Sequence, residues 1–217
     1  LYNTLTASLN STTNMMEIEI SSSFGGYSGN ITEQFSGGSI QGYLDLINGK
    51  GSYADTTANP PDNTFRGTLY YKSAIDTFAS NFAKVLNDLN QGNSATALPL
   101  FANASGTATT DITAGNIRIS SAWLDDSTYI TTTTAVPAAG GSDNITRMIS
   151  ALESDMKFVN SSSTVMFEGT ANEYMTGLIG ELSLDVELHQ NFADTASTVQ
   201  NNLYASREAM SGVSLDE

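Results

Sequence analysis

The feature that most constrains the fold is a helix-forming stretch from Thr170 to Glu217 with a seven-residue repeat. Thr170 and Glu173 have the spacing of a capping box, in which each side chain can bond an unpaired backbone N–H at a helix start. No proline follows, and we expect the helix to run past the end of the sequence. The repeat predicts a thin, Ala-rich seam that packs closely on a partner helix. The repeat positions are Met175, Leu182, His189, Ala196, Leu203 and Met210, and Leu178, Val186, Ala193 and Val199 lie three or four residues after one of them.

Apolar residues at spacings of three and four predict three shorter helices earlier in the chain. The first follows Ser39 as its N-cap. The second runs from about residue 67 to residue 90 and stops at Gly92. The third is capped by Ser142 or Asp143. The apolar faces of these helices are Ile40, Tyr43, Leu44 and Ile47; Tyr71, Ile75, Phe78, Ala79, Phe82, Val85, Leu86 and Leu89; and Ile145, Met148, Ile149, Leu152 and Met156.

Extended segments separate these helices. Residues 16–20 alternate between apolar side chains and glutamates, which is the period of a half-buried strand, and residues 31–35 suggest a second short strand. The chain is therefore predicted to be α+β: an elongated antiparallel helical bundle with a long C-terminal helix and a small β-rich portion. The predicted parts are a β-rich outer segment (1–36), a first rod part (37–98), a β and loop segment (99–141) and a second rod part (142–217).

The composition excludes several classes of function. The chain has 217 residues, a net charge of −15 and only 8 Lys and Arg, so nucleic acids and anionic membranes are poor partners. There are no cysteines, which excludes disulfides and thiolate metal sites, and no apolar run reaches the roughly 18 residues of a membrane span. The polarity comes from Ser, Thr, Asn and Gly, as is common in secreted and surface proteins.

No arrangement of residues predicts catalysis. His189 is the only histidine and lies on the heptad seam, where a packing role is the simpler interpretation. Glu17 and Glu19 fit the solvated face of a strand, and the glycines before Ser39 lack the Lys-Ser/Thr of a phosphate loop. Trp123 stands near Asp125-Asp126, but core anchoring explains it better than a sugar or calcium site. We expect no enzyme activity, no metal and no cofactor. Formal N-glycosylation sequons begin at Asn10, Asn30, Asn103, Asn144 and Asn160.

Three segments resemble the flagellar hook-associated protein 1 family, bacterial axial proteins of the hook–filament junction. Gly37 to Leu46 (GGSIQGYLDL) is similar to the family's G-G-x-(L/I)-x-G-x-L-D element. Gly67 to Asn87 resembles a family helix with apolar residues every three to four positions. Ser211 to Glu217 (SGVSLDE) is similar to the S-G-V-(N/S)-L-D-E-E signature that opens the family's terminal coiled-coil segment. The loop from Gly49 to Phe65 looks like a lineage-specific insertion.

The resemblance implies a structural subunit that joins hook to filament by self-assembly. It implies a ring of like subunits as partners, together with hook protein, the second junction protein and an export chaperone. It also implies type III export to the bacterial exterior, and a longer protein with helices before Leu1 and after Glu217. The implied assembly residues are Ser211, Gly212, Val213, Leu215, Asp216 and Glu217. The alternatives are another axial protein, such as hook protein or flagellin, or a secreted carbohydrate-binding or adhesive module that uses Trp123.

Overall fold

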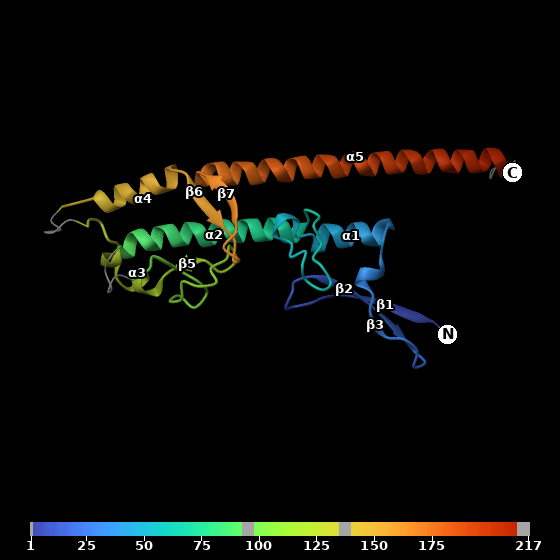
Figure 1. The fold of residues 1–217 in the computed structure, drawn as a ribbon, viewed down its shortest axis with the longest axis horizontal. Helices are drawn as coiled ribbons and strands as arrows, with labels where there is room; N and C mark the ends of the chain where they lie inside the picture. The colour runs from blue at the N-terminus through green and yellow to red at the C-terminus, as the bar shows by residue number, and fades with distance from the viewer. Residues whose placement is uncertain (1, 93–97, 135–139, 212–217) are drawn as a thin grey trace. The chain divides into compact units, whose positions relative to one another are not determined.

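The computed structural model describes residues 2–92, 98–134 and 140–211. It is a mixed α+β chain with a long C-terminal helix, as predicted (Figure 1). The chain divides into two compact units, residues 1–174 and residues 175–217, and the boundary lies inside that helix. Within the described residues, no helix combines the length and apolar character needed to cross a membrane.

Five α-helices and three short 3₁₀ helices lie in the described residues. The predicted helices at 39–47, 67–90 and 142–156 are present, although each differs from the prediction in its bounds or its buried face. A short helix after Ser120 was not predicted. The bounds are α1 Gly38–Asn48, α2 Thr68–Gln91, α3 Ser121–Asp125, α4 Asp143–Glu153 and α5 Ala171–Ser211, with η1 Thr32–Gln34, η2 Gly51–Tyr53 and η3 Ser127–Tyr129.

The strands form three small antiparallel sheets. The alternating segment at 16–20 is a strand, as predicted, whereas residues 31–35 contain the 3₁₀ helix η1 because Gln34 N–H turns back to the Ile31 carbonyl. Strand β1 pairs with β2 so that Leu5, Ala7 and Leu9 oppose Ile20, Ile18 and Met16. The strands are β1 Asn3–Leu9, β2 Met16–Ser22, β3 Gly29–Asn30, β4 Phe101–Ala102, β5 Arg118–Ile119, β6 Met156–Val159 and β7 Val165–Gly169.

Helix α2 is the centre of the first unit, and buried asparagines tie extended segments to it. Asn87 accepts hydrogen bonds from the backbone N–H groups of Leu100 and Phe101 and donates one to the Phe101 carbonyl, each at 2.8 Å. Asn81 pairs in the same way with both backbone groups of Val159, at 2.8 and 3.2 Å. A side-chain amide carries one donor and one acceptor group, so each asparagine substitutes for the backbone of a neighbouring strand.

Three more buried asparagines also form hydrogen bonds with the backbone of segments distant in the sequence. Asn90 donates to Leu98 and Tyr129 carbonyls and accepts from Thr131 N–H. Asn144 on α4 donates to the carbonyls of Leu89 and Thr131, and Asn48 on α1 holds both backbone groups of Met16. We call these five residues the asparagine clamps; they are Asn48, Asn81, Asn87, Asn90 and Asn144.

The buried face of α2 matches the predicted one only in part. Ala79 and Leu86 are buried, as predicted, but Ile75 is 41% exposed, and Ala74 and Ala83, which were not assigned to that face, are among the most buried residues of the helix. Backbone segments approach α2 closely, so small side chains and the clamps fit where large apolar ones do not. Helix α1 shows the same shift, because Leu44 is buried but Tyr43 is 66% exposed.

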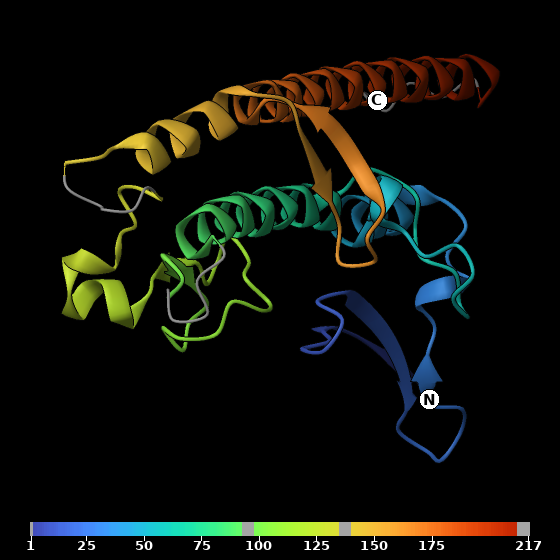
Figure 2. The same cartoon turned by 60° about the vertical axis from the view of Figure 1, so that its left-hand side comes forward.

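Aromatic rings fill the remaining core beside α2. Phe82 packs on Phe101 at 5.5 Å between ring centroids, and Phe101 meets Trp123 edge-on at 6.4 Å. The β6–β7 hairpin lies beside the middle of α2 (Figure 2), and its Phe158 is fully buried against Tyr174 at 4.4 Å. The Tyr174 hydroxyl donates to the buried Ala74 carbonyl at 2.8 Å. Trp123 is therefore a core anchor, as predicted.

The end of the third predicted helix is corrected. Residue Met156 was assigned to the apolar face of that helix, but α4 ends at Glu153 and Met156 begins strand β6. Strand β7 follows and pairs with β6 around a turn held by Asn160. The β-branched run after Tyr129 belongs to no sheet, because Asn90 and Asn144 satisfy the backbone of Thr131 instead.

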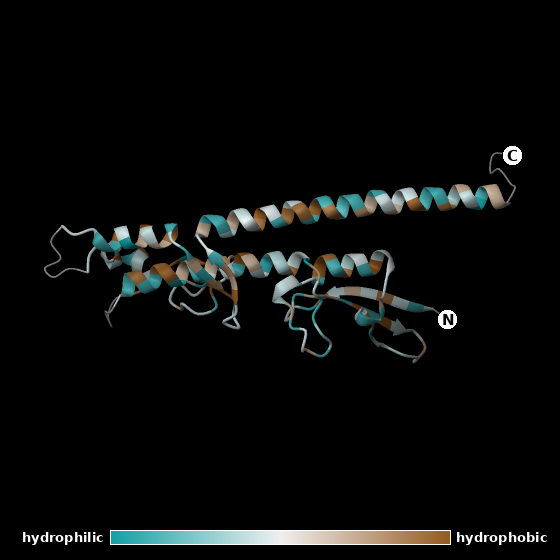
Figure 3. Ribbon diagram, turned by 45° about the horizontal axis from the view of Figure 1, so that its top comes forward, coloured by the Kyte–Doolittle hydropathy of each residue, from teal (hydrophilic) through white to brown (hydrophobic). Residues whose placement is uncertain are grey.

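Helices α1 and α2 follow one another end to end (Figures 1 and 3). The Gly49 carbonyl accepts hydrogen bonds from the N–H groups of Gly67 and Tyr70, so it caps the start of α2. A side chain on either glycine would collide with backbone: a Cβ on Gly49 would lie 2.5 Å from the carbonyl oxygens of Asp45 and Phe65. Residues 50–66, which we call the α1–α2 loop, therefore leave the helical path and rejoin it at one point.

Candidate functional site

Helix α5 begins with the capping box that the sequence predicts. Glu173 N–H donates to the Thr170 hydroxyl at 3.1 Å, and the Glu173 carboxylate accepts from Thr170 N–H at 2.8 Å. The bond from Thr170 N–H, and then a second bond from the Thr170 hydroxyl to the same carboxylate, lower the pKa of Glu173 below its ordinary value. The helix has 41 residues and would be about 60 Å long at 1.5 Å per residue.

The apolar side chains of α5 are mostly exposed. In Figure 3 the brown colour of hydrophobic residues recurs along the ribbon of this helix. They form more than the single thin seam that the repeat predicts. In the first half they follow one another at spacings of two and three, which places them on several sides of the helix. In the second half Val199, Leu203 and Met210, at spacings of four and seven, form one stripe. The exposed set is Ile179, Leu182, Leu184, Val186, Leu188, Phe192, Val199, Leu203, Tyr204 and Met210.

Only one of the predicted assembly residues is among the described residues. Ser211 is the last residue of α5. Gly212, Val213, Leu215, Asp216 and Glu217 lie outside the described residues.

The residues weighed for chemistry do not converge within the first unit. Trp123 packs on Phe101, and Asp126 accepts a hydrogen bond from Thr128 N–H, which lowers its pKa. Glu17 accepts one from Asn10. His189 lies on α5 in the second unit. In the part of the chain that the structure describes, no three His, Cys, Asp or Glu side chains are grouped to hold a metal ion.

Four of the five sequon asparagines shape their own turns. Asn10, Asn30, Asn103 and Asn160 each accept a hydrogen bond from the backbone N–H two residues later, at 2.9 to 3.0 Å. This is the geometry of an Asx turn, which Asn followed closely by Ser or Thr favours. The fifth, Asn144, is a fully buried clamp. Turn formation thus explains why the sequence pattern recurs.

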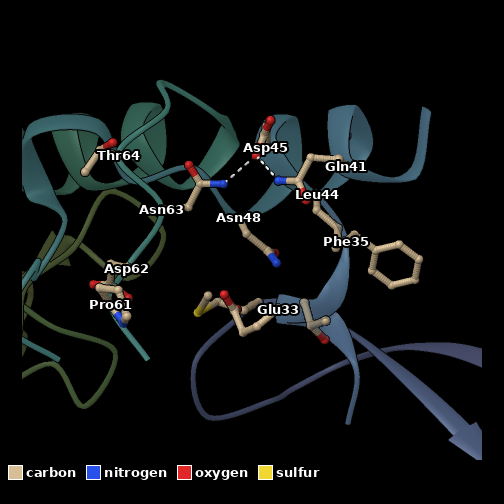
Figure 4. A pocket seen from close by; sticks show the side chains of 12 residues that line it. Glu33, Phe35, Gln41, Leu44, Asp45, Asn48, Pro61, Asp62, Asn63 and Thr64 are labelled. Atoms are coloured by element: carbon tan, nitrogen blue, oxygen red, sulfur yellow. Dashed lines mark hydrogen bonds between the residues drawn. The ribbon is translucent and has the colours of Figure 1, made fainter. Parts of the chain in front are cut away.

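A polar cavity of about 330 Å³ lies between η1, α1 and the α1–α2 loop. Figure 4 shows the side chains of α1 above it, Glu33 below it and Asp62 on the loop side. Asp45 is fixed in its wall, because one carboxylate oxygen accepts hydrogen bonds from Gln41 at 2.6 Å and Asn63 at 2.7 Å. Its lining residues are Met15, Thr32, Glu33, Phe35, Gln41, Leu44, Asp45, Asn48, Pro61, Asp62, Asn63 and Thr64.

The loop that walls this cavity is internally braced. Lys50 forms an ion pair with Asp62 at 2.7 Å, and Asp62 also accepts from Asp55 N–H at 2.9 Å. Asp55 in turn accepts from the Thr57 hydroxyl and N–H, and these bonds lower its pKa. Neither the cavity nor the clamps were predicted from the sequence. The only local signal was asparagine inside predicted helices, where it is a poor helix former.

One acidic group has a strongly perturbed pKa. Hydrogen bonds from the Thr133 hydroxyl, then from Thr134 N–H and hydroxyl, lower the pKa of Asp143 to about 2. Asp143 is the first residue of α4, where a negative charge is also favoured by the helix dipole. At the predicted cap, the Asp143 side chain therefore binds the preceding residues Thr133 and Thr134, and Ser142 makes no side-chain capping bond.

The chain matches no protein-family model, and no curated protein is significantly similar to it.

Proposed function

We propose that this chain is a structural subunit of the bacterial flagellum that joins hook to filament by self-assembly and performs no catalysis. The proposal rests on the three sequence segments that resemble the hook-associated protein 1 family. The observation that supports it best is α5, a 41-residue helix with exposed apolar residues along most of its length. A helix in water gains most of its stability from tertiary packing, so α5 calls for partner helices.

In this proposal α5 is one member of an elongated antiparallel bundle. Its first half, with apolar residues on several sides, contacts more than one helix, and its second half, with one stripe, pairs with a single helix. The partners are like subunits in a ring, hook protein, the second junction protein and an export chaperone. The protein acts outside the cell after type III export. The proposal further places the assembly signal at residues 211–217.

Helix α5 offers a matched test of assembly. Leu203→Glu puts a charge on the single stripe, whereas Asn201→Glu adds the same charge two residues earlier, at an exposed polar position on the opposite side of the helix. In cells that lack the endogenous junction protein, Asn201→Glu should restore swimming and filament growth on hooks. Leu203→Glu should abolish both while the fluorescence of Trp123 stays native. Wild-type motility with Leu203→Glu, or with a chain deleted after Ser211, would refute the proposal.

A carbohydrate-binding module remains the alternative from a different class. The ring of Trp123 packs on Phe101 in the core, so it offers less surface for stacking on a sugar than the sequence suggested. Glycan binding that disappears in Trp123→Ala, with the fold retained, would favour the module over the flagellar subunit.

A further inference from the structure

The cavity beside α1 has features of a binding site that the assembly function does not require. Its volume, about 330 Å³, lies at the lower end of the range of small-ligand sites. One wall of the cavity comes from Pro61 to Thr64 of the α1–α2 loop. The connection from α1 to α2 does not need this loop, because Gly49 and Gly67 are already hydrogen-bonded to each other. The loop nevertheless keeps one geometry through the Lys50–Asp62 ion pair and the Asn63–Asp45 hydrogen bond.

The hydrogen-bonding capacity of the lining residues is one-sided. Both ends of the Asn48 amide are committed to Met16, and the Asn63 amide is committed to Asp45 and Phe65 N–H. Among the hydrogen bonds of the described residues, the second carboxylate oxygen of Asp45 and both oxygens of Glu33 take no donor. The wall therefore presents mainly acceptors, and a ligand must bring donors.

The charged and apolar residues of the lining restrict the class of ligand further. Three carboxylates line the cavity (Glu33, Asp45 and Asp62), and no lysine or arginine is among the lining residues. Lys50 outside the lining offsets only Asp62. Leu44, which is 5% exposed, contributes apolar wall within the same cavity, so methylene groups as well as a charge find a partner there.

We propose that this cavity binds an alkylammonium group, a primary amine on a short aliphatic stem. The ammonium donates hydrogen bonds to one carboxylate of the lining, Asp45 or Glu33, and the stem lies against Leu44. The group comes either from a lysine side chain of a protein or from a free diamine. A neutral alcohol of equal length lacks the charge and the second and third donors, so it binds far more weakly.

Nuclear magnetic resonance titration of the whole chain tests the proposal. Amide shifts of ¹⁵N-labelled protein are followed with 1,5-diaminopentane, with N-acetyl-lysine methylamide and with 1-pentanol, all at constant ionic strength. We expect saturable shifts from the two amines, confined to residues around the cavity, and none from pentanol. Tighter binding of the lysine derivative identifies a protein side chain as the source, and tighter binding of the diamine identifies a free amine.

Isosteric variants distinguish amine binding in this cavity from a general attraction of amines to an acidic protein. Asp45→Asn keeps an oxygen that can accept from Gln41 and Asn63, and Glu33→Gln changes an exposed residue, so both should fold. At least one of the two should weaken amine binding about five-fold, the size expected for one half-exposed charge pair. Asp125→Asn removes the same charge from an exposed position elsewhere and should change nothing. Equal weakening in all three variants, or shifts scattered over the surface, would overturn the proposal.

Discussion

Replacing Asn87 by alanine should destabilise the first unit severely, although it removes no apolar group. The residue is 4% exposed, and its side chain satisfies Leu100 N–H, Phe101 N–H and the Phe101 carbonyl. Leu100 is 3% exposed, so water cannot replace its lost partner without opening the core. Each unsatisfied buried polar group costs about 1–3 kcal/mol. Because Phe101 is half-buried, water can partly replace the partner of its two groups, so we expect the free energy of unfolding to fall by about 3–5 kcal/mol in total.

Asn87→Leu distinguishes lost hydrogen bonds from lost packing. Leucine has the same number and branching of side-chain heavy atoms as asparagine, but its methyl groups cannot pair with the three backbone groups. If the clamp mechanism is correct, Asn87→Leu should lose at least about 3 kcal/mol as well, because the same groups stay unsatisfied. Asp88→Ala on the next residue breaks only an exposed ion pair with Lys84 and should cost at most about 1 kcal/mol.

Urea unfolding followed by Trp123 fluorescence measures these losses. The indole packs edge-on against Phe101, so the only tryptophan reports on the segment that Asn87 holds. A loss of 3–5 kcal/mol should also lower the melting temperature by about 10 °C. The reasoning is refuted if Asn87→Leu unfolds at the wild-type urea concentration with an unchanged slope, because packing would then suffice without the three hydrogen bonds.

Two further predictions concern single positions. The pKa of Asp143 is lowered to about 2 from an ordinary value of 3.8, so its charge stabilises the fold fully above that ordinary value and the contribution disappears as pH falls through about 2. Asp143→Asn should therefore flatten the pH dependence of the urea midpoint between pH 4 and pH 2, and an unchanged slope would contradict this assignment. Gly49→Ala should cost about 1–3 kcal/mol in thermal unfolding, since its Cβ would press on the Asp45 and Phe65 carbonyls. Gly42→Ala, whose Cβ would meet open space inside α1, should instead stabilise by about 0.5–1 kcal/mol.

Local sequence signals determined which segments are helical. The apolar spacing in residues 67–90 predicts α2, because a helix repeats every 3.6 residues whatever surrounds it. The capping box at Thr170 and Glu173 locates the start of α5 to the residue, since its bonds join groups three positions apart. The alternation at residues 16–20 predicts β2 for the same local reason. These elements follow from interactions within a few residues of each other.

The tertiary structure alone decided which face of each helix is buried and what covers it. Asn81 donates a hydrogen bond to Val159, 78 residues away in the sequence, and Asn90 donates one to Tyr129, 39 residues away. The periodicity of the sequence does not predict such pairs. The cavity likewise combines residues from Met15 to Thr64, which come together because Gly49 and Gly67 are in contact at the base of the α1–α2 loop. Periodicity in a sequence reports the geometry of one element, whereas burial and satisfaction of backbone groups depend on partners distant in sequence. The sequence by itself therefore determined the long helix and its repeat, and the packing of the chain determined the asparagine clamps and the acidic cavity.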